Sequence, residues 1–168
     1  HLPAGEDSVG CSLFAHIDVD HVQCLNEAVD GSCRRVFRPW ADRLDRSHSV
    51  QSDADQELLF NIPFSGSVKL KSLVVIGPDD SAHPFTARLY KNKPFMTFDS
   101  VSGGECDQEV GLAQDPDGLI AYPLKTVKFS SVTHLTIYIP RNFANDNDVP
   151  TSLYYIGLNG EFLGSASR

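Results

Sequence analysis

Three carboxylates at alternate positions, Asp53, Asp55 and Glu57, are the residues of this chain best placed to do chemistry. An extended segment would put them on one side, where they could bind a hard cation such as calcium. The segment has neither the glycine nor the later glutamate of an EF-hand loop. The alternative is a structural turn in which Ser52 or Asp53 accepts hydrogen bonds from nearby backbone amides. The sequence favours the turn, and contact with a protein partner is the second interpretation.

A second group, Asp18, Asp20, His21 and Cys24, contains the residue types of a zinc site. Zinc sites with a cysteine usually draw on a second paired cluster of ligands, and the sequence offers none. We therefore expect no metal ion here. Cys24 is interpreted as a small buried residue beside Asn26, whose amide stabilises a loop.

Nucleophilic catalysis by a cysteine would require a histidine or a helix terminus beside the thiol. The four cysteines form no CxxC pair, the histidines are scattered, and no Cys–His motif is present. His134 lies in a strand pattern opposite Leu135, Ile137 and Ile139, so it is expected at the surface or partly covered. The sequence predicts no catalytic residue, no cofactor and no enzymatic activity.

A short basic segment is the remaining candidate. Arg34, Arg35 and Arg38 form the only dense basic group, and Trp40, the only tryptophan, follows them. An exposed tryptophan flanked by arginines is typical of a protein interface. The favoured alternative is that the ring pins the loop to the rest of the fold. These four residues, with the aspartates at 53 and 55, are the candidate partner-binding residues.

Composition limits the classes of function. The chain has 168 residues, is 41% hydrophobic and carries a net charge of -8, which fits one domain and argues against a nucleic-acid binder. No apolar run approaches the ~20 residues of a membrane span. The first residues lack the basic and apolar regions of a signal peptide, and no Asn-x-Ser/Thr sequon is present. We therefore expect reduced cysteines and a cytoplasmic protein, with the nucleus as a further location.

The elements that must position these residues are expected to be strands. Leu58, Phe60, Ile62 and Phe64 alternate onto one face, and Pro63 suggests an edge strand or a bulged one. A Ser-Gly turn at 65–66 and an Asn-Gly hairpin turn at 159–160 are predicted, with a short helical turn at 18–22 capped by an aspartate. Further strands are expected at 13–17, 68–76, 85–90, 125–129, 132–139 and 153–158. Short strands with hardly a helix predict an antiparallel β-sandwich.

Several short motifs, taken in order and spacing, resemble the PITH (proteasome-interacting thioredoxin) domain family. The matching runs are 24–27, 52–55, 57–59, 62–64, 68–70, 77–78, 128–132, 135–137 and 155–158. Two further runs, 36–40 and 88–92, resemble the stand-alone branch of that family. The resemblance covers roughly 13–161, nearly the whole chain. It implies an all-β jelly-roll sandwich like galactose-binding domains.

The resemblance also implies a function. Members have no known catalytic residues and associate with the proteasome regulatory particle, so the expectation is a non-enzymatic adaptor of the 26S proteasome. A carbohydrate-binding or other small-molecule-binding jelly-roll, or a structural subunit of another large cytoplasmic assembly, is the alternative. No preceding thioredoxin domain with a redox CxxC is present, so disulfide reductase activity is not expected. The family-motif residues expected to be structural are Cys24, Asn26, Leu58, Phe60, Ile62, Phe64, Phe129 and Gly157.

The division of the chain follows from the same resemblance. We expect an N-terminal extension at 1–12, a PITH-like sandwich at 13–162 and the start of a C-terminal tail at 163–168. The expected partner is a protein, with neither nucleic acid nor membrane as a binding surface.

Overall fold

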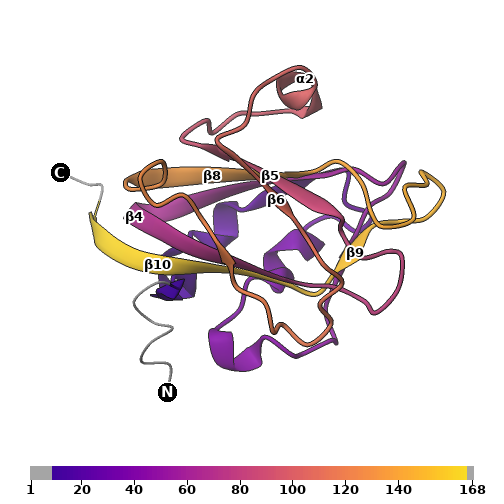
Figure 1. Ribbon diagram of the computed structural model, residues 1–168, viewed down its shortest axis with the longest axis horizontal. Helices are drawn as coiled ribbons and strands as arrows, with labels where there is room; N and C mark the ends of the chain where they lie inside the picture. Colours follow the sequence, from indigo (N-terminus) through magenta and orange to yellow (C-terminus); the bar gives the residue numbers. More distant parts are fainter. Residues whose placement is uncertain (1–8, 166–168) are drawn as a thin grey trace.

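Two long strands form the centre of the fold in the computed structural model, which describes residues 9–165. β4 (Leu58–Ile76) and β10 (Tyr155–Ser165) run antiparallel side by side (Figure 1). β4 also pairs with β8 (Val132–Ile139), β2 (Gln23–Leu25) and β7 (Tyr122–Pro123). Its first half therefore lies between β2 and β8, while its second half lies beside β10.

The remaining strands extend this arrangement. The main sheet runs in the order β1-β10-β4-β8-β5-β6, with β1 at Cys11–Ser12, β5 at Thr86–Lys91 and β6 at Gln108–Gly111. A small second sheet pairs β3 (Val50–Gln51) with β9 (Ser152–Leu153). Each of these pairings is antiparallel, and the sheet curls around an apolar core. The all-β antiparallel jelly-roll sandwich predicted from the sequence is confirmed.

Helical structure in the described part of the chain is short. Single 3₁₀ turns lie at Phe14–His16, Val19–His21, Ser32–Val36 and Trp40–Asp42. The α-helix α2 (Phe98–Val101) sits on the loop between β5 and β6, which projects at the top of Figure 1. No helix within residues 9–165 is long and apolar enough to cross a membrane.

The alternation that predicts β4 is matched by its burial. Leu58, Phe60 and Ile62 are fully buried in the main core, and Phe64 is nearly so. Leu59, on the opposite face, is also fully buried, because the loop carrying α2 covers that face and forms a second apolar cluster with it. Strong burial on both faces explains why the strand is apolar at its start.

Two glycines that predicted turns instead lie inside continuous strands, so both turn predictions were wrong. A Cβ on Gly66 would collide with the Gly164 carbonyl, and one on Gly160 would collide with the Lys69 carbonyl. β4 and β10 therefore approach too closely at these points for any side chain. Their pairing also shifts register after Asn159, which is a bulge and not a hairpin turn.

Pro63 was interpreted as a mark of an edge or bulged strand, and half of that interpretation holds. β4 is central, since it has neighbours on both sides, so the edge position is wrong. The pairing with β8 does shift register between Pro63 and Val68, which is the bulge. The ladder is interrupted where proline cannot donate a hydrogen bond.

Two other predicted strands are absent. The predictions were wrong because a short apolar run can form either a strand or a turn whose apolar side chain is buried in the core. Residues 13–17 contain the 3₁₀ turn Phe14–His16, and residues 125–129 form a turn held by Phe129, which is fully buried. The helical turn expected at 18–22 is present at Val19–His21, with Asp18 at its N-cap position. The Asp18 carboxylate contacts His21 and does not cap the backbone.

The predicted extension, 1–12, and tail, 163–168, lie partly outside the described residues. Within them, Cys11–Ser12 form β1 and pair with β10, while residues 163–165 complete β10.

Candidate protein-binding site

The candidate site is built around the 3₁₀ turn Ser32–Val36, which carries Arg34 and Arg35. Two open hollows of about 500 Å³ and about 280 Å³ adjoin it and share Asp30 and Gly31 in their walls. Arg35 lines the larger hollow and Arg34 the smaller one. The turn therefore presents the two guanidinium groups toward neighbouring concave surfaces.

A single carboxylate, that of Glu27, holds this turn in place. Its Oε2 accepts a hydrogen bond from the Gly31 N–H at 2.8 Å, and its Oε1 accepts one from the Cys33 N–H at 2.9 Å. Gly31 has a φ of 84°, a left-handed conformation that favours glycine. The carboxylate thus satisfies backbone donors that the short turn cannot pair itself.

Arg34, Arg35 and His48 form the basic part of the site. Arg34 Nε donates to the Val22 carbonyl at 3.2 Å, which fixes its stem. Arg35 Nη1 lies 3.3 Å from His48 Nδ1 at the rim of the larger hollow. Among residues 9–165 none of these three side chains forms an ion pair, so the positive charge of both guanidiniums stays available to a ligand.

Arg38 serves the loop itself. Its guanidinium donates to three backbone carbonyls, those of Arg35 at 2.6 Å, Asp45 at 2.9 Å and Asp42 at 3.2 Å. It also lies over the Tyr155 ring at 5.6 Å from the centroid. Arg38 therefore crosslinks the loop that follows the 3₁₀ turn. Its role is structural and differs from that of Arg34 and Arg35.

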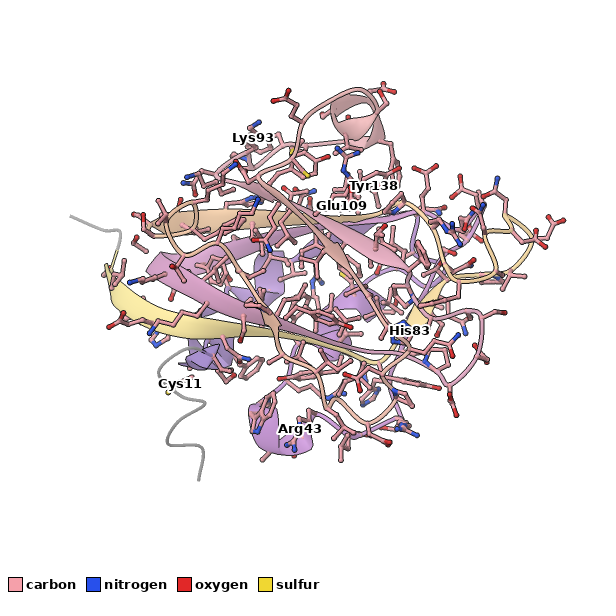
Figure 2. All side chains as sticks on the ribbon, viewed as in Figure 1. Cys11, Arg43, His83, Lys93, Glu109 and Tyr138 are labelled. Atoms are coloured by element: carbon pink, nitrogen blue, oxygen red, sulfur yellow. The ribbon has the colours of Figure 1, made fainter. Side chains whose placement is uncertain are left out.

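Trp40 is half-buried and pins the same loop. Its ring contacts Tyr155 edge-on, with centroids 6.4 Å apart, and packs against the cluster of Val74 and Ile76. The Arg43 guanidinium covers the ring at 4.2 Å (Arg43 is labelled in Figure 2). The pinning role favoured from the sequence is the one the contacts support.

The acidic segment folds into a turn organised by Asn26. The Asn26 amide donates to the Glu57 carbonyl at 2.7 Å and to Asp55 Oδ1 at 2.9 Å, and it accepts from the Ala54 N–H at 3.0 Å. Asp55 also accepts from the Glu57 N–H at 2.9 Å. The predicted structural turn is present, but Asp55 and not Asp53 is the capping carboxylate.

Asp53 is exposed, and its backbone N–H donates to the Asn26 carbonyl at 2.9 Å. Glu57 accepts a hydrogen bond from the Tyr138 hydroxyl, and its carboxylate is therefore turned away from Asp53. No group of three or more histidine, cysteine, aspartate or glutamate side chains within residues 9–165 is arranged to hold a metal ion. The three carboxylates of the sequence pattern are thus separated by the tertiary structure.

The two thiols near the site are buried. Burial raises the pKa of Cys24 well above its ordinary value, and burial followed by the Glu27 carboxylate raises the pKa of Cys33 to about 12. Both thiols are therefore protonated at neutral pH and are poor nucleophiles. All four cysteines, including exposed Cys11 and half-buried Cys106, are free.

His134 is buried, so the expectation of a surface or partly covered histidine was wrong. The loop after β5 covers it: Asn92 N–H donates to the His134 carbonyl at 2.7 Å, and the Asn92 side chain accepts from the His134 N–H at 3.3 Å. Burial lowers the pKa of its imidazole. The same effect lowers the pKa of His83, a buried histidine that joins Pro84 to Asp115.

The sequence interpretation missed Glu27 and His48. Glu27 lies four residues before Gly31 and six before Cys33, and a carboxylate followed by a glycine-containing turn is a recognisable anchor. His48 lies 13 residues from Arg35, with no local pattern that joins them. Only the path of the loop from 34 to 48 brings them together.

Comparison with known structures defines the class of fold. The C-terminal domain of a chitobiase from Bacteroides fragilis superposes with a TM-score of 0.58 at 11% identity, over 88% of this chain and 94% of that one. The CBM32-3 module of a family 31 glycoside hydrolase from Clostridium perfringens gives a TM-score of 0.56 at 11% identity, over 94% and 98%. The chain therefore has a jelly-roll fold similar to those of the chitobiase domain and the CBM32-3 module.

Sequence comparison defines the family within that class. The PITH domain model matches residues 3–168. PITH domain-containing protein 1 of Xenopus laevis is 53% identical over 89% of this chain and 70% of its own length. Its human counterpart is 48% identical over 95% and 74%. The chain belongs to the PITH domain family.

Proposed function

We propose that this chain is a non-enzymatic adaptor that binds a protein partner through Arg34, Arg35 and His48. The observation that carries the proposal is the Arg35–His48 pair at the rim of the larger hollow, which has no carboxylate partner among the described residues. Arg35 is exposed, and an accessible arginine whose backbone is held rigidly can bind the carboxylate of an acidic side chain in bidentate fashion. The Glu27 carboxylate supplies the rigidity.

The proposed partner is the regulatory particle of the 26S proteasome, in the cytoplasm or the nucleus. Family membership supports this choice, since resemblance to PITH domains implies association with that particle. The non-enzymatic character is supported by the two protonated, buried thiols and by the use of Arg38 and Trp40 to hold the loop.

Carbohydrate binding is less well supported. The structural neighbours share the fold at 11% identity, which carries no binding specificity. The two aromatic side chains considered for a sugar are both approached by arginines: Arg43 covers Trp40, and Arg46 lies 5.8 Å from the centre of the Tyr154 ring.

A direct binding measurement tests the proposal. Purified regulatory particle is immobilised and titrated with the wild-type chain, with Arg35→Ala and with Gln114→Glu. Each variant lowers the net charge by one, but Gln114, which is exposed on the loop after β6, lines neither of the two hollows. Arg35→Ala is expected to weaken binding about tenfold or more, and Gln114→Glu to leave it unchanged.

Two results would count against the proposal. Equal binding by wild type and Arg35→Ala would place the contact on another surface. Absence of binding, together with affinity purification that recovers a different assembly, would replace the proteasome as the partner.

A further inference from the structure

A second basic surface lies away from the candidate site and combines lysines with two exposed apolar side chains. Figure 2 shows Lys93, on this surface, at the opposite side of the view from Arg43. We call it the lysine face, and it consists of Lys91, Lys93, Phe95, Lys125, Val127 and Lys128.

Hydrogen bonds place the two segments of the lysine face side by side. Lys91 Nζ donates to the Lys128 carbonyl at 2.5 Å, and Asn92 Nδ2 donates to the Ser131 carbonyl at 3.2 Å. The Asn92 side chain also accepts from the Thr133 N–H at 2.9 Å. The loop after β5 is thereby joined to the turn before β8, although more than 30 residues separate them in sequence.

The loop that carries Phe95 is fixed to the sheet on both sides of that residue. Thr136 Oγ1 donates to the Lys93 carbonyl, and Asn61 Nδ2 donates to the Met96 carbonyl, each at 3.4 Å. Met96 itself is buried. The Phe95 side chain is nevertheless 91% exposed. A rigid loop therefore holds a large aromatic side chain in solvent, which costs free energy unless something covers it.

Val127 repeats this arrangement on the neighbouring turn. Leu124 and Phe129 are buried on either side of it, and the Phe129 carbonyl accepts the Leu70 N–H at 2.9 Å. Val127 is 88% exposed between Lys125 and Lys128. Phe95 and Val127 are thus the tips of two anchored segments.

The charge of the lysine face is not neutralised by the chain. Within residues 9–165 none of its four lysines forms an ion pair. The Asp107 carboxylate is directed to the Lys91 backbone N–H at 2.8 Å. All six lysines of the chain lie between residues 69 and 128, in a protein with a net charge of -8. This local positive charge has the sign that attracts an acidic surface.

We propose that the lysine face is a second docking surface, which binds an acidic protein segment that also carries apolar side chains. Phe95 and Val127 supply the buried contact, and the lysines supply the surrounding charge complementarity. A protein is favoured over an anionic membrane because only two large apolar side chains project from this face, while the chain as a whole carries a net charge of -8 and would be repelled. The proposal does not depend on the Arg35–His48 site.

Amide chemical shifts of the full chain provide the test. The probe is a peptide in which leucine and phenylalanine alternate with pairs of glutamates. One control peptide has glutamine for each glutamate, and the other has serine for each apolar residue. The expected result is shifts confined to residues 91–97 and 124–133, with each control peptide binding at least about tenfold more weakly.

Matched variants separate the contact from general effects. Phe95→Ser with Val127→Ser is expected to weaken binding of the probe about tenfold. Leu119→Ser, at a residue 82% exposed elsewhere, should have no effect. Shifts outside the two segments, or equal binding of the glutamine peptide, would overturn the proposal. So would binding to phosphatidylserine vesicles without binding to the probe, since the face would then be a membrane contact.

Discussion

The arginine loop, residues 34–48, and the lysine face are the two basic regions of an acidic protein, and they use their charge differently. In the arginine loop, Arg38 donates to three backbone carbonyls, and Arg43 covers Trp40. On the lysine face, Lys91 is the one lysine whose side chain donates a hydrogen bond within residues 9–165, and Phe95 and Val127 stay exposed. The first region is held together by its cations, whereas the second is held mainly by the uncharged side chains of Asn92, Asn61 and Thr136.

The chemistry of the two side chains explains the difference. A guanidinium is planar, offers five donors and stacks on aromatic rings, so it can crosslink an irregular loop. An ammonium is a compact, strongly hydrated charge on a flexible stem, and it contributes little to local order. Substitution of Arg38 in the arginine loop should therefore lower stability, whereas substitution of the exposed Lys93 on the lysine face should leave stability nearly unchanged.

The largest expected effect is on the core that both regions share. Leu58 is fully buried and pairs with Ile139 of β8. Leu58→Ala should lower the free energy of unfolding by about 2–5 kcal/mol, through lost burial and a residual cavity. Urea unfolding followed by Trp40 fluorescence and by amide signals of residues 92–97 should show one shared transition. Separate transitions would mean that the two regions unfold independently. A change in the free energy of unfolding below about 0.5 kcal/mol would show that Leu58 is not buried.

The next test compares one cation from each region. Arg38→Ala should lower the free energy of unfolding by about 1–2 kcal/mol, because carbonyls of the loop lose their donor. The matched control, Lys93→Ala, removes the same charge from an exposed position and should change stability by less than about 0.5 kcal/mol. Chemical denaturation of both variants measures the two free energies of unfolding. Equal losses would mean that the arginine loop and the lysine face do not differ in how they use their cations.

A pH dependence should arise from two buried histidines, of which His134 lies beneath the loop after β5. Burial lowers the pKa of His134 and of His83, so the unfolded chain takes up these protons first as pH falls. Their contribution to stability is complete above the unfolded pKa of about 6.5 and is lost as pH falls through it, by at most about 1.4 kcal/mol per pH unit for each histidine.

Thermal melts across this range measure the effect. His134→Gln should reduce the slope, because one of the two groups no longer titrates. A melting temperature that is constant from about pH 7.5 to about pH 5 would contradict the prediction.

The smallest expected effect is that of calcium on the acidic turn. Asp55 is engaged by Asn26 and by the Glu57 N–H, and Glu57 by Tyr138, so the carboxylates do not converge on a cation. The melting temperature should be the same in millimolar calcium and in EDTA. A rise of several degrees with calcium, abolished by Asp53→Asn with Asp55→Asn, would establish a cation site that stabilises the native state by mass action.

The alternation of apolar and polar residues predicted the strands of the fold, but it did not predict the contacts between distant segments. Alternation identified β4, β5 and β8, because a strand with one face in the core must alternate. The turns at 65–66 and 159–160 were wrong, since glycine there serves the close approach of two strands distant in sequence. A glycine in a sequence shows that space or backbone freedom is needed, and it does not show which of the two.

The candidate site also has features that the sequence predicts and features that only the tertiary structure determines. The sequence by itself determined that the basic residues at 34–38 and the acidic turn at 53–57 would stand out, because charge density and spacing are written in the chain. Only the tertiary structure decided that Arg38 would hold the loop, that Arg35 would meet His48, and that Phe95 would remain in solvent. The physical reason is that each of these outcomes depends on which groups from distant segments lie next to the residue. The long-range pairing of β4 with β8 and β10 determines those neighbours.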